Sequence, residues 1–190
     1  MNNYCSNITF TSKITPVTLK DFNKISRSVG IDNLAGYPWV LGTSAKGTSV
    51  YTKDVLNCCV CLITNGEKAL LMHLNPCRSQ NHDFDSVLRY VKKHIDVGSK
   101  NLHAILLGSK NVPKSLELFG KFKEMLFSLN IPFSVFKNGK MTTHAAYSAK
   151  TDEFFISSES IDYMLNRGLD NAKSIKNAFE KVELNKIDYI

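Results

Sequence analysis

The sequence lacks the segments that direct a protein to a membrane or to the general secretory route. Residues 1–13 have no basic stretch followed by an apolar stretch, which is the pattern of a secretory signal. No apolar run along the chain reaches the roughly 20 residues that cross a bilayer as a helix. We therefore expect a protein with no membrane span that is not exported by the general secretory route.

Cysteine is scarce and unsuited to a disulfide framework. The chain holds five cysteines, an odd number, and four of them lie between Cys58 and Cys77. Small secreted domains instead have an even number of cysteines, which pair in disulfide bonds. We therefore expect thiols, and a reducing cytosol as the place of action.

The sequence also has no P-loop, no dinucleotide-binding fingerprint, no internal repeat and no arginine-rich run. The net charge is +7, but the basic residues are interleaved with acidic ones along the chain. This distribution is typical of a solvated surface and not of the concentrated basic patch that binds nucleic acid. We expect no cofactor and no nucleic-acid partner.

What the sequence does contain is the composition of an ordinary globular protein, with 43% apolar and 22% charged residues in 190. This length suits one domain with a sizeable core. We predict a single, monomeric domain over residues 1–190. Its core spans about residues 50–157, between an N-terminal helix and loop at 1–49 and a C-terminal helical segment at 158–190.

The hydrophobic pattern predicts a mixture of helices and strands. A helix begins after Thr18, whose hydroxyl can cap the N–H of Asp21, and the glycine-containing residues 33–49 predict a loop. Further elements follow in chain order: a helix over 81–97, a strand over 102–107, a helix opening near Pro113, strands over 132–136, 141–147 and 154–156, and an amphipathic helical segment from Ser160 to Val182.

The order of these elements predicts an α+β fold. The strand-helix-strand unit between residues 102 and 136 implies a right-handed crossover between parallel strands. Turns at Asn138-Gly139 and at 149–152 instead predict antiparallel hairpins near the end of the chain. Antiparallel strands with helices on one side make an α+β sandwich.

The most informative stretch is residues 52–76, which predicts a β-hairpin with Asn65-Gly66 at its tip between two apolar runs. Counting equal distances in both directions from Gly66 places Cys59 beside His73, at the base of the hairpin. A thiol beside an imidazole is the signature of an activated nucleophile.

The segments Val55–Ile63 and Leu70–Pro76 resemble the active-site hairpin of the bacterial glutamine deamidases. These include the chemoreceptor deamidase CheD, the catalytic domain of cytotoxic necrotizing factor and the Burkholderia lethal factor. Their hairpin carries a Leu-x-x-Cys nucleophile, an apolar strand, a glycine-containing turn and a histidine near the end of the returning strand. Leu56–Cys59 fits Leu-x-x-Cys, with Asn57 and Cys58 where those families carry small Gly or Ser residues.

This resemblance implies a hydrolase that converts a glutamine of a partner protein to glutamate. Cys59 would attack the side-chain amide, and His73 would transfer the protons. In CheD and the Burkholderia factor a threonine shortly before the cysteine belongs to the site, and Thr52 is the nearest match. The resemblance further implies a CheD-like αββ sandwich around the hairpin, with a strand-helix-strand crossover, and a bacterial toxin or effector that acts in the host cytoplasm.

The choice between the two adjacent thiols stays open. Neighbouring residues of a strand point to opposite faces, so only one of Cys58 and Cys59 can face His73. The hairpin register and Leu-x-x-Cys favour Cys59. Thr52 lies six residues before Cys58 and seven before Cys59, and counting six residues from this threonine selects Cys58 instead.

Other functions are compatible with the same residues. An amine that intercepts the thioester in place of water would make the protein a transglutaminase. A non-catalytic interaction module, which uses cysteine as a small buried hydrophobe, is a third hypothesis. His103 and His144 have no partner in the pattern, and we expect them to be structural. Four residues have the spacing of a small zinc site: Cys58, Cys61, His73 and Cys77.

Overall fold

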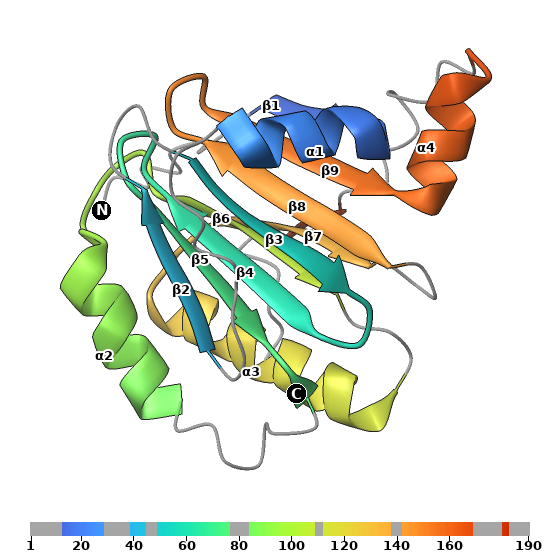
Figure 1. The fold of residues 1–190 in the computed structure, drawn as a ribbon. Helices are drawn as coiled ribbons and strands as arrows, with labels where there is room; N and C mark the ends of the chain where they lie inside the picture. The colour runs from blue at the N-terminus through green and yellow to red at the C-terminus, as the bar shows by residue number, and fades with distance from the viewer. Residues whose placement is uncertain are drawn as a thin grey trace.

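The computed structural model describes residues 13–28, 39–44, 49–76, 84–108, 112–137, 142–168 and 180–182. Ten strands and four helices lie within these ranges (Figure 1). The strands are β1 (Lys13–Pro16), β2 (Trp39–Ser44), β3 (Ser49–Val55), β4 (Cys59–Thr64), β5 (Ala69–Leu74), β6 (His103–Gly108), β7 (Phe133–Lys137), β8 (Thr143–Ser148), β9 (Glu153–Ser158) and β10 (Glu180–Val182). The helices are α1 (Leu19–Ser28), α2 (Phe84–His94), α3 (Pro113–Ser128) and α4 (Glu159–Asn166).

The strands form two mixed sheets. Sheet A has the order β1-β9-β8-β3, and sheet B has the order β10-β7-β6-β4-β5-β2. The pairs β1–β9 and β6–β7 are parallel, whereas the other pairs among the described residues are antiparallel. The predicted α+β class is confirmed, and α3 connects the parallel strands β6 and β7 as the crossover predicts.

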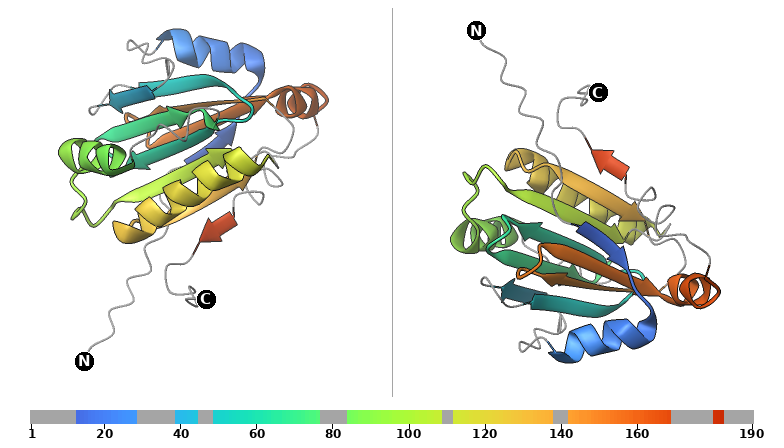
Figure 2. Two further views of the ribbon diagram at one scale, coloured as in Figure 1. Left: turned by 90° about the horizontal axis from the view of Figure 1, so that it is seen from below. Right: turned by 90° about the horizontal axis from the view of Figure 1, so that it is seen from above.

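Sheet B is covered on both faces, which explains why its central strands β4 and β6 are buried along their whole length and mostly apolar. In β4, Cys61 and Ile63 pack toward α2 and α3, whereas Val60 and Leu62 pack toward sheet A. The outer face of sheet A is covered by α1, through Phe22 (Figure 2). The prediction that the helices lie on one side of the strands is therefore wrong for α1, whose apolar stripe needs its own sheet face to be buried.

The β4–β5 hairpin is present, but its turn is longer than a two-residue tip. Thr64 pairs with Ala69, so residues 65–68 form the turn. Asn65 Oδ1 accepts hydrogen bonds from the N–H of Glu67 (3.1 Å) and from the N–H of the following residue (2.8 Å). The prediction centred the hairpin on Gly66, whereas the observed turn is centred between Gly66 and Glu67. The pairing of β4 with β5 therefore differs from the predicted pairing by one residue, so that Cys59 pairs with Leu74.

Two further segments differ from the prediction because pairing in a sheet overrides local preference. Residues 39–44, predicted as loop, form β2 at an edge of sheet B. The predicted C-terminal helical segment is helical over α4, but residues 180–182 form β10, which pairs with β7. The predicted turn at Asn138-Gly139 lies outside the described residues.

The start of α1 agrees with the sequence. Thr18 Oγ1 accepts a hydrogen bond from the N–H of Asp21 (3.1 Å), which caps the first turn of the helix. None of the helices in the described part of the chain combines the length and the apolar character needed to cross a membrane.

Candidate active site

Thr52 and His73 are joined by a hydrogen bond between the two sheets. Thr52 belongs to β3 of sheet A and His73 to the end of β5 in sheet B, and Thr52 Oγ1 lies 2.7 Å from His73 Nδ1. The threonine is almost fully buried, whereas the histidine is partly exposed. The contact restrains the orientation of the imidazole, so that Nε2 is the ring nitrogen left for proton transfer. The structure thus brings together two of the residues that the hairpin resemblance assigns to one site.

A bulge in β3 directly follows Thr52. Between Thr52 and Val55 the β3–β8 register shifts, so Lys53 and Asp54 together stand opposite His144 alone. Asp54 has a φ of 59°, in the left-handed region that residues other than glycine seldom adopt. Because of the extra residue, Thr52 and Val55 both point between the sheets, although strict alternation would put residues three apart on opposite faces.

His73 is a neutral base in this setting. Burial lowers the pKa of His73 to about 4, and the nearby carboxylate of Asp54 opposes part of that shift. The imidazole is therefore uncharged at pH 7 and able to accept a proton. The hydroxyl of Thr52 can either donate to Nδ1 or accept from it, so the contact suits either tautomer.

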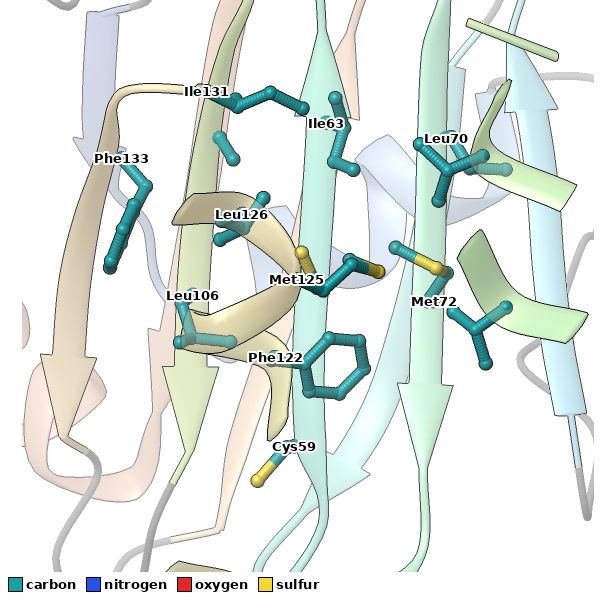
Figure 3. Packing of buried hydrophobic residues seen from close by; sticks show 14 of the residues in the cluster. Cys59, Ile63, Leu70, Met72, Leu106, Phe122, Met125, Leu126, Ile131 and Phe133 are labelled. Carbon is teal, nitrogen blue, oxygen red and sulfur yellow. The ribbon is translucent and has the colours of Figure 1, made fainter. Parts of the chain in front are cut away.

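Cys59 points away from His73. The β4–β5 ladder pairs Cys59 with Leu74 and pairs Val60 with His73. Directly opposed residues share a face of the sheet, so Cys59 lies on the face that α3 covers. Its Sγ donates a hydrogen bond to the carbonyl oxygen of Ser115 (3.6 Å), and Figure 3 shows it among the side chains beneath that helix. The prediction that Cys59 faces His73 is wrong, because the four-residue turn shifts the register.

Cys58 is the thiol on the side of His73. It directly precedes β4, packs against the core between the two sheets and is partly exposed. The end of β3, the start of β4 and the end of β5 lie at the same end of the sandwich (Figure 1), and Thr52, Cys58 and His73 belong to these segments. A partly exposed thiol near a basic group is the environment of reactive cysteines.

Neighbouring elements hold the backbone that carries Cys58. From the first turn of α3, the hydroxyl of Ser115 donates to the carbonyl oxygen of Asn57 (2.7 Å). From β6, Gly108 (φ 131°) comes so close that a Cβ at this position would lie 2.5 Å from the carbonyl oxygen of Cys58. Only glycine tolerates both this conformation and this approach. The first turn of α3 therefore lies against the segment before β4. The dipole of α3 favours negative charge at this N-terminal end of the helix.

Asn57 gives this segment a polar side chain whose oxygen is buried. Within the described ranges no group donates a hydrogen bond to this Oδ1 atom. A buried acceptor without a donor costs on the order of 1–3 kcal/mol. The backbone of the segment is nevertheless anchored, through the bond from Ser115 to the Asn57 carbonyl.

The residues of the zinc alternative are divided between the two faces of sheet B. Cys58 packs between the sheets, whereas Cys61 packs toward the helices. Burial raises the pKa of the Cys61 thiol, which opposes the thiolate form that binds metal. Cys77 lies outside the described residues. Among the side chains that are described, no three of the His, Cys, Asp and Glu type are grouped to hold a metal ion.

His103 and His144 contact backbone groups. His103 is buried in β6, with Nδ1 3.1 Å from the carbonyl oxygen of Asn101, and burial lowers its pKa. His144 in β8 lies on the outer face of sheet A, where its ring packs 5.6 Å from that of Phe22. These environments fit the structural roles expected from the sequence.

Sequence reasoning missed the two residues that support the Cys58 segment. Gly108 had a signal, because a glycine that ends an apolar strand often marks a close backbone approach. Ser115 had none, since its contact with Asn57 joins residues 58 apart. Comparison with known proteins adds no family to this geometry: no family model matches the chain, and no curated protein matches its sequence.

Proposed function

We propose that the protein is a cysteine-dependent protein-glutamine deamidase, with Cys58 as nucleophile, His73 as base and acid, and Thr52 as the group that orients His73. The observation that carries the proposal is the 2.7 Å contact between Thr52 Oγ1 and His73 Nδ1 at the end of the sandwich where Cys58 precedes β4. A nucleophile, a base and a third group that orients the base are the parts that covalent catalysis requires.

The geometry supports a thioester mechanism with one proton shuttle. Neutral His73 takes the proton from Cys58 Sγ, and the thiolate attacks the side-chain amide carbon of a glutamine. Backbone N–H groups before β4 and the N-terminus of α3 lower the energy of the oxyanion that forms. His73 then gives its proton to the departing ammonia, which leaves a thioester on Cys58.

The second half of the reaction returns the site to its starting state. His73 removes a proton from a water molecule, and the resulting hydroxide adds to the thioester carbon. The carbon–sulfur bond breaks, glutamate is released, and Cys58 recovers its proton from His73. The three side chains and water account for every proton and bond in this cycle, and the backbone N–H groups stabilise the oxyanion.

The substrate that best fits the site is a glutamine on the surface of a folded protein. Cys58 and His73 are partly exposed at one end of the sandwich, where a projecting side chain can reach them. The likeness of the hairpin to those of toxin deamidases supports a bacterial effector whose target is a host protein.

Mass spectrometry of host-cell lysate tests this function. Lysate proteins are exposed to the wild type and to Cys58→Ser, with Cys59→Ser as the matched cysteine control. A gain of about 1 Da at particular glutamines, present with wild type and Cys59→Ser but absent with Cys58→Ser, is the expected result. Addition of an amine with loss of ammonia would make the protein a transglutaminase. No modified glutamine with any variant would overturn the proposal.

A further inference from the structure

Ser115 binds the chain on both sides of Cys58. Its hydroxyl donates a hydrogen bond to the carbonyl oxygen of Asn57 (2.7 Å), and its own carbonyl oxygen accepts one from Cys59 Sγ (3.6 Å). Asn57 directly precedes Cys58 in the sequence, and Cys59 directly follows it. One residue of α3 is therefore attached to both neighbours of the proposed nucleophile.

The segment that Ser115 holds lies between two strands. Residues 56–58 connect the end of β3 in sheet A with the start of β4 in sheet B, and the ladders of the described strands do not include them. A strand residue is held by the hydrogen bonds of its ladder, whereas the backbone groups of a connecting residue need partners from elsewhere. The hydroxyl of Ser115 is such a partner for the residue before Cys58.

This hydroxyl donates outside its own helix. Ser115 lies in the first turn of α3, and its backbone N–H bonds to the carbonyl oxygen of Val112 (2.9 Å). The residue is fully buried, so bulk water does not satisfy the hydroxyl. A buried hydroxyl needs a partner within the protein, and here that partner is the carbonyl of Asn57, 58 residues away in the sequence.

Strand β6 bounds the same segment. Gly108 pairs with Cys59, and a Cβ at Gly108 would lie 2.5 Å from the carbonyl oxygen of Cys58. The segment therefore has little room to move toward β6, and the two bonds to Ser115 oppose movement away from α3. These contacts restrict the backbone on both sides of the Cys58 side chain.

We propose that Ser115 is a positioning residue for Cys58, because it holds the chain on both sides of this residue and so fixes the backbone from which the thiol projects. The adjacent Cys59 then belongs to the site as an anchor, although its own thiol faces α3 and not His73. The consequence for catalysis rests on the proposed deamidase function, whereas the effect on the reactivity of the Cys58 thiol does not.

The first test removes the hydroxyl and then restores it. Ser115→Ala lacks the donor and should fold, because alanine is small and favourable in a helix. Ser115→Thr keeps a hydroxyl on the same carbon atom. Ser128→Ala is the matched control, since the hydroxyl of this second serine of α3 also donates to a backbone carbonyl, that of Met125 (2.8 Å).

The readout of this test is the carbonyl ¹³C signal of Asn57 in the labelled full chain, which shifts when the carbonyl loses a hydrogen bond. We expect the signal to shift in Ser115→Ala and to stay near its wild-type position in Ser115→Thr and Ser128→Ala. If threonine is too large for this buried place, the comparison of the two alanine variants decides.

The second test separates positioning from a general loosening of the fold. Each variant is treated with iodoacetamide near pH 7, and peptide mapping gives the rate of labelling at each cysteine. Loss of positioning should slow the labelling of Cys58 about fivefold in Ser115→Ala, while the buried thiols of Cys59 and Cys61 stay as protected as in the wild type. Loosening would instead speed the labelling of the buried thiols, because local opening exposes them.

A pair of variants at Cys59 tests the second attachment. Cys59→Ala removes the donor to the carbonyl of Ser115, whereas Cys59→Ser keeps one. We expect Cys58 to be labelled about threefold more slowly in the alanine variant than in the serine variant. Equal rates would remove Cys59 from the anchor.

Three results would overturn the inference for Ser115. These are an unchanged Asn57 carbonyl signal in Ser115→Ala, labelling of Cys58 in this variant as fast as in Ser128→Ala, or faster labelling of the buried thiols. A chain that modifies no glutamine in host-cell lysate, but whose Cys58 reactivity follows the variants as stated, would refute the deamidase function and leave the positioning role supported.

Discussion

Val60, and not Cys59, lies directly across the β4–β5 ladder from His73. Because side chains alternate along a strand, this one pairing places the two adjacent cysteines on different sides of sheet B. Cys59 is buried against the helix layer, and Cys58 packs against the core between the two sheets, where Thr52 of sheet A contacts His73 of sheet B. The chemistry of the site therefore depends on a register that differs by one residue from the one the sequence suggests.

The two cysteines should respond differently to substitution. Cys58→Ser removes the proposed nucleophile, and we expect no detectable deamidation. Cys59→Ser keeps a donor for the carbonyl of Ser115, so activity should stay within about threefold of wild type, with some loss of stability because a polar group enters the core. Peptide mapping after brief treatment with iodoacetamide near pH 7 should find label at Cys58 first. Faster labelling of Cys59 would contradict this assignment.

Thr52→Val should lower activity while the fold is retained. The two side chains have nearly the same shape, but valine cannot bond to Nδ1 of His73. Loss of the group that orients the base should reduce kcat about tenfold or more, with little change in KM. Thr52→Ser keeps the hydroxyl and is the matched control, expected near wild-type activity. Equal activity of the valine and serine variants would remove Thr52 from the site.

The stability of the protein should fall as the pH is lowered from 7 to 5. The pKa of His73 is about 4 in the folded state and near the ordinary 6.5 in the unfolded state. Between these pH values the unfolded chain binds more protons than the folded protein, so acid favours unfolding. The contribution of His73 to the free energy of unfolding is therefore fully retained above about pH 6.5 and decreases as the pH is lowered toward 4. For His73 the loss at pH 5 is about 2 kcal/mol.

Urea unfolding of the wild type and of His73→Gln at both pH values measures this contribution. The free energy of unfolding of the wild type should fall by about 2 kcal/mol more than that of the variant. Parallel losses in both proteins would show that other groups, such as the buried His103, account for the pH dependence. The same pKa predicts that the acid limb of the pH–rate profile lies below pH 6.5.

Gly108→Ala should damage the site through the backbone. The new Cβ would lie 2.5 Å from the carbonyl oxygen of Cys58, at a φ of 131° that alanine rarely adopts. We expect a lower melting temperature and slower alkylation of Cys58. Gly120→Ala in α3 is the control, since a Cβ there meets nothing within 4 Å and alanine stabilises a helix interior by about 0.5–1 kcal/mol. A Gly108→Ala protein as stable and reactive as wild type would disprove the close approach.

The elements that have local signals could be predicted from the sequence. Continuous apolar runs predicted the central strands β4 and β6, periods of three and four predicted α2 and α3, and the cap at Thr18 predicted the start of α1. The sequence also drew attention to the two adjacent cysteines and to His73, because these residues lie in one short hairpin, whereas Thr52 was selected only by the resemblance of this stretch to the glutamine deamidases. Local patterns predict these features because the period of a helix, the alternation of a strand and a helix cap each depend on residues that are close in the sequence.

Which of those residues meet depends on how the strands pair and how the two sheets pack. The register depends on where Asn65 closes the turn, the strand character of β2 and β10 depends on open sheet edges, and the contact of Thr52 with His73 depends on the packing of one sheet on the other. At the bulge in β3, the backbone N–H of Asp54 donates a hydrogen bond to a histidine 90 residues away, His144. These contacts form between segments that are far apart in the sequence. The local pattern around each residue therefore does not predict them.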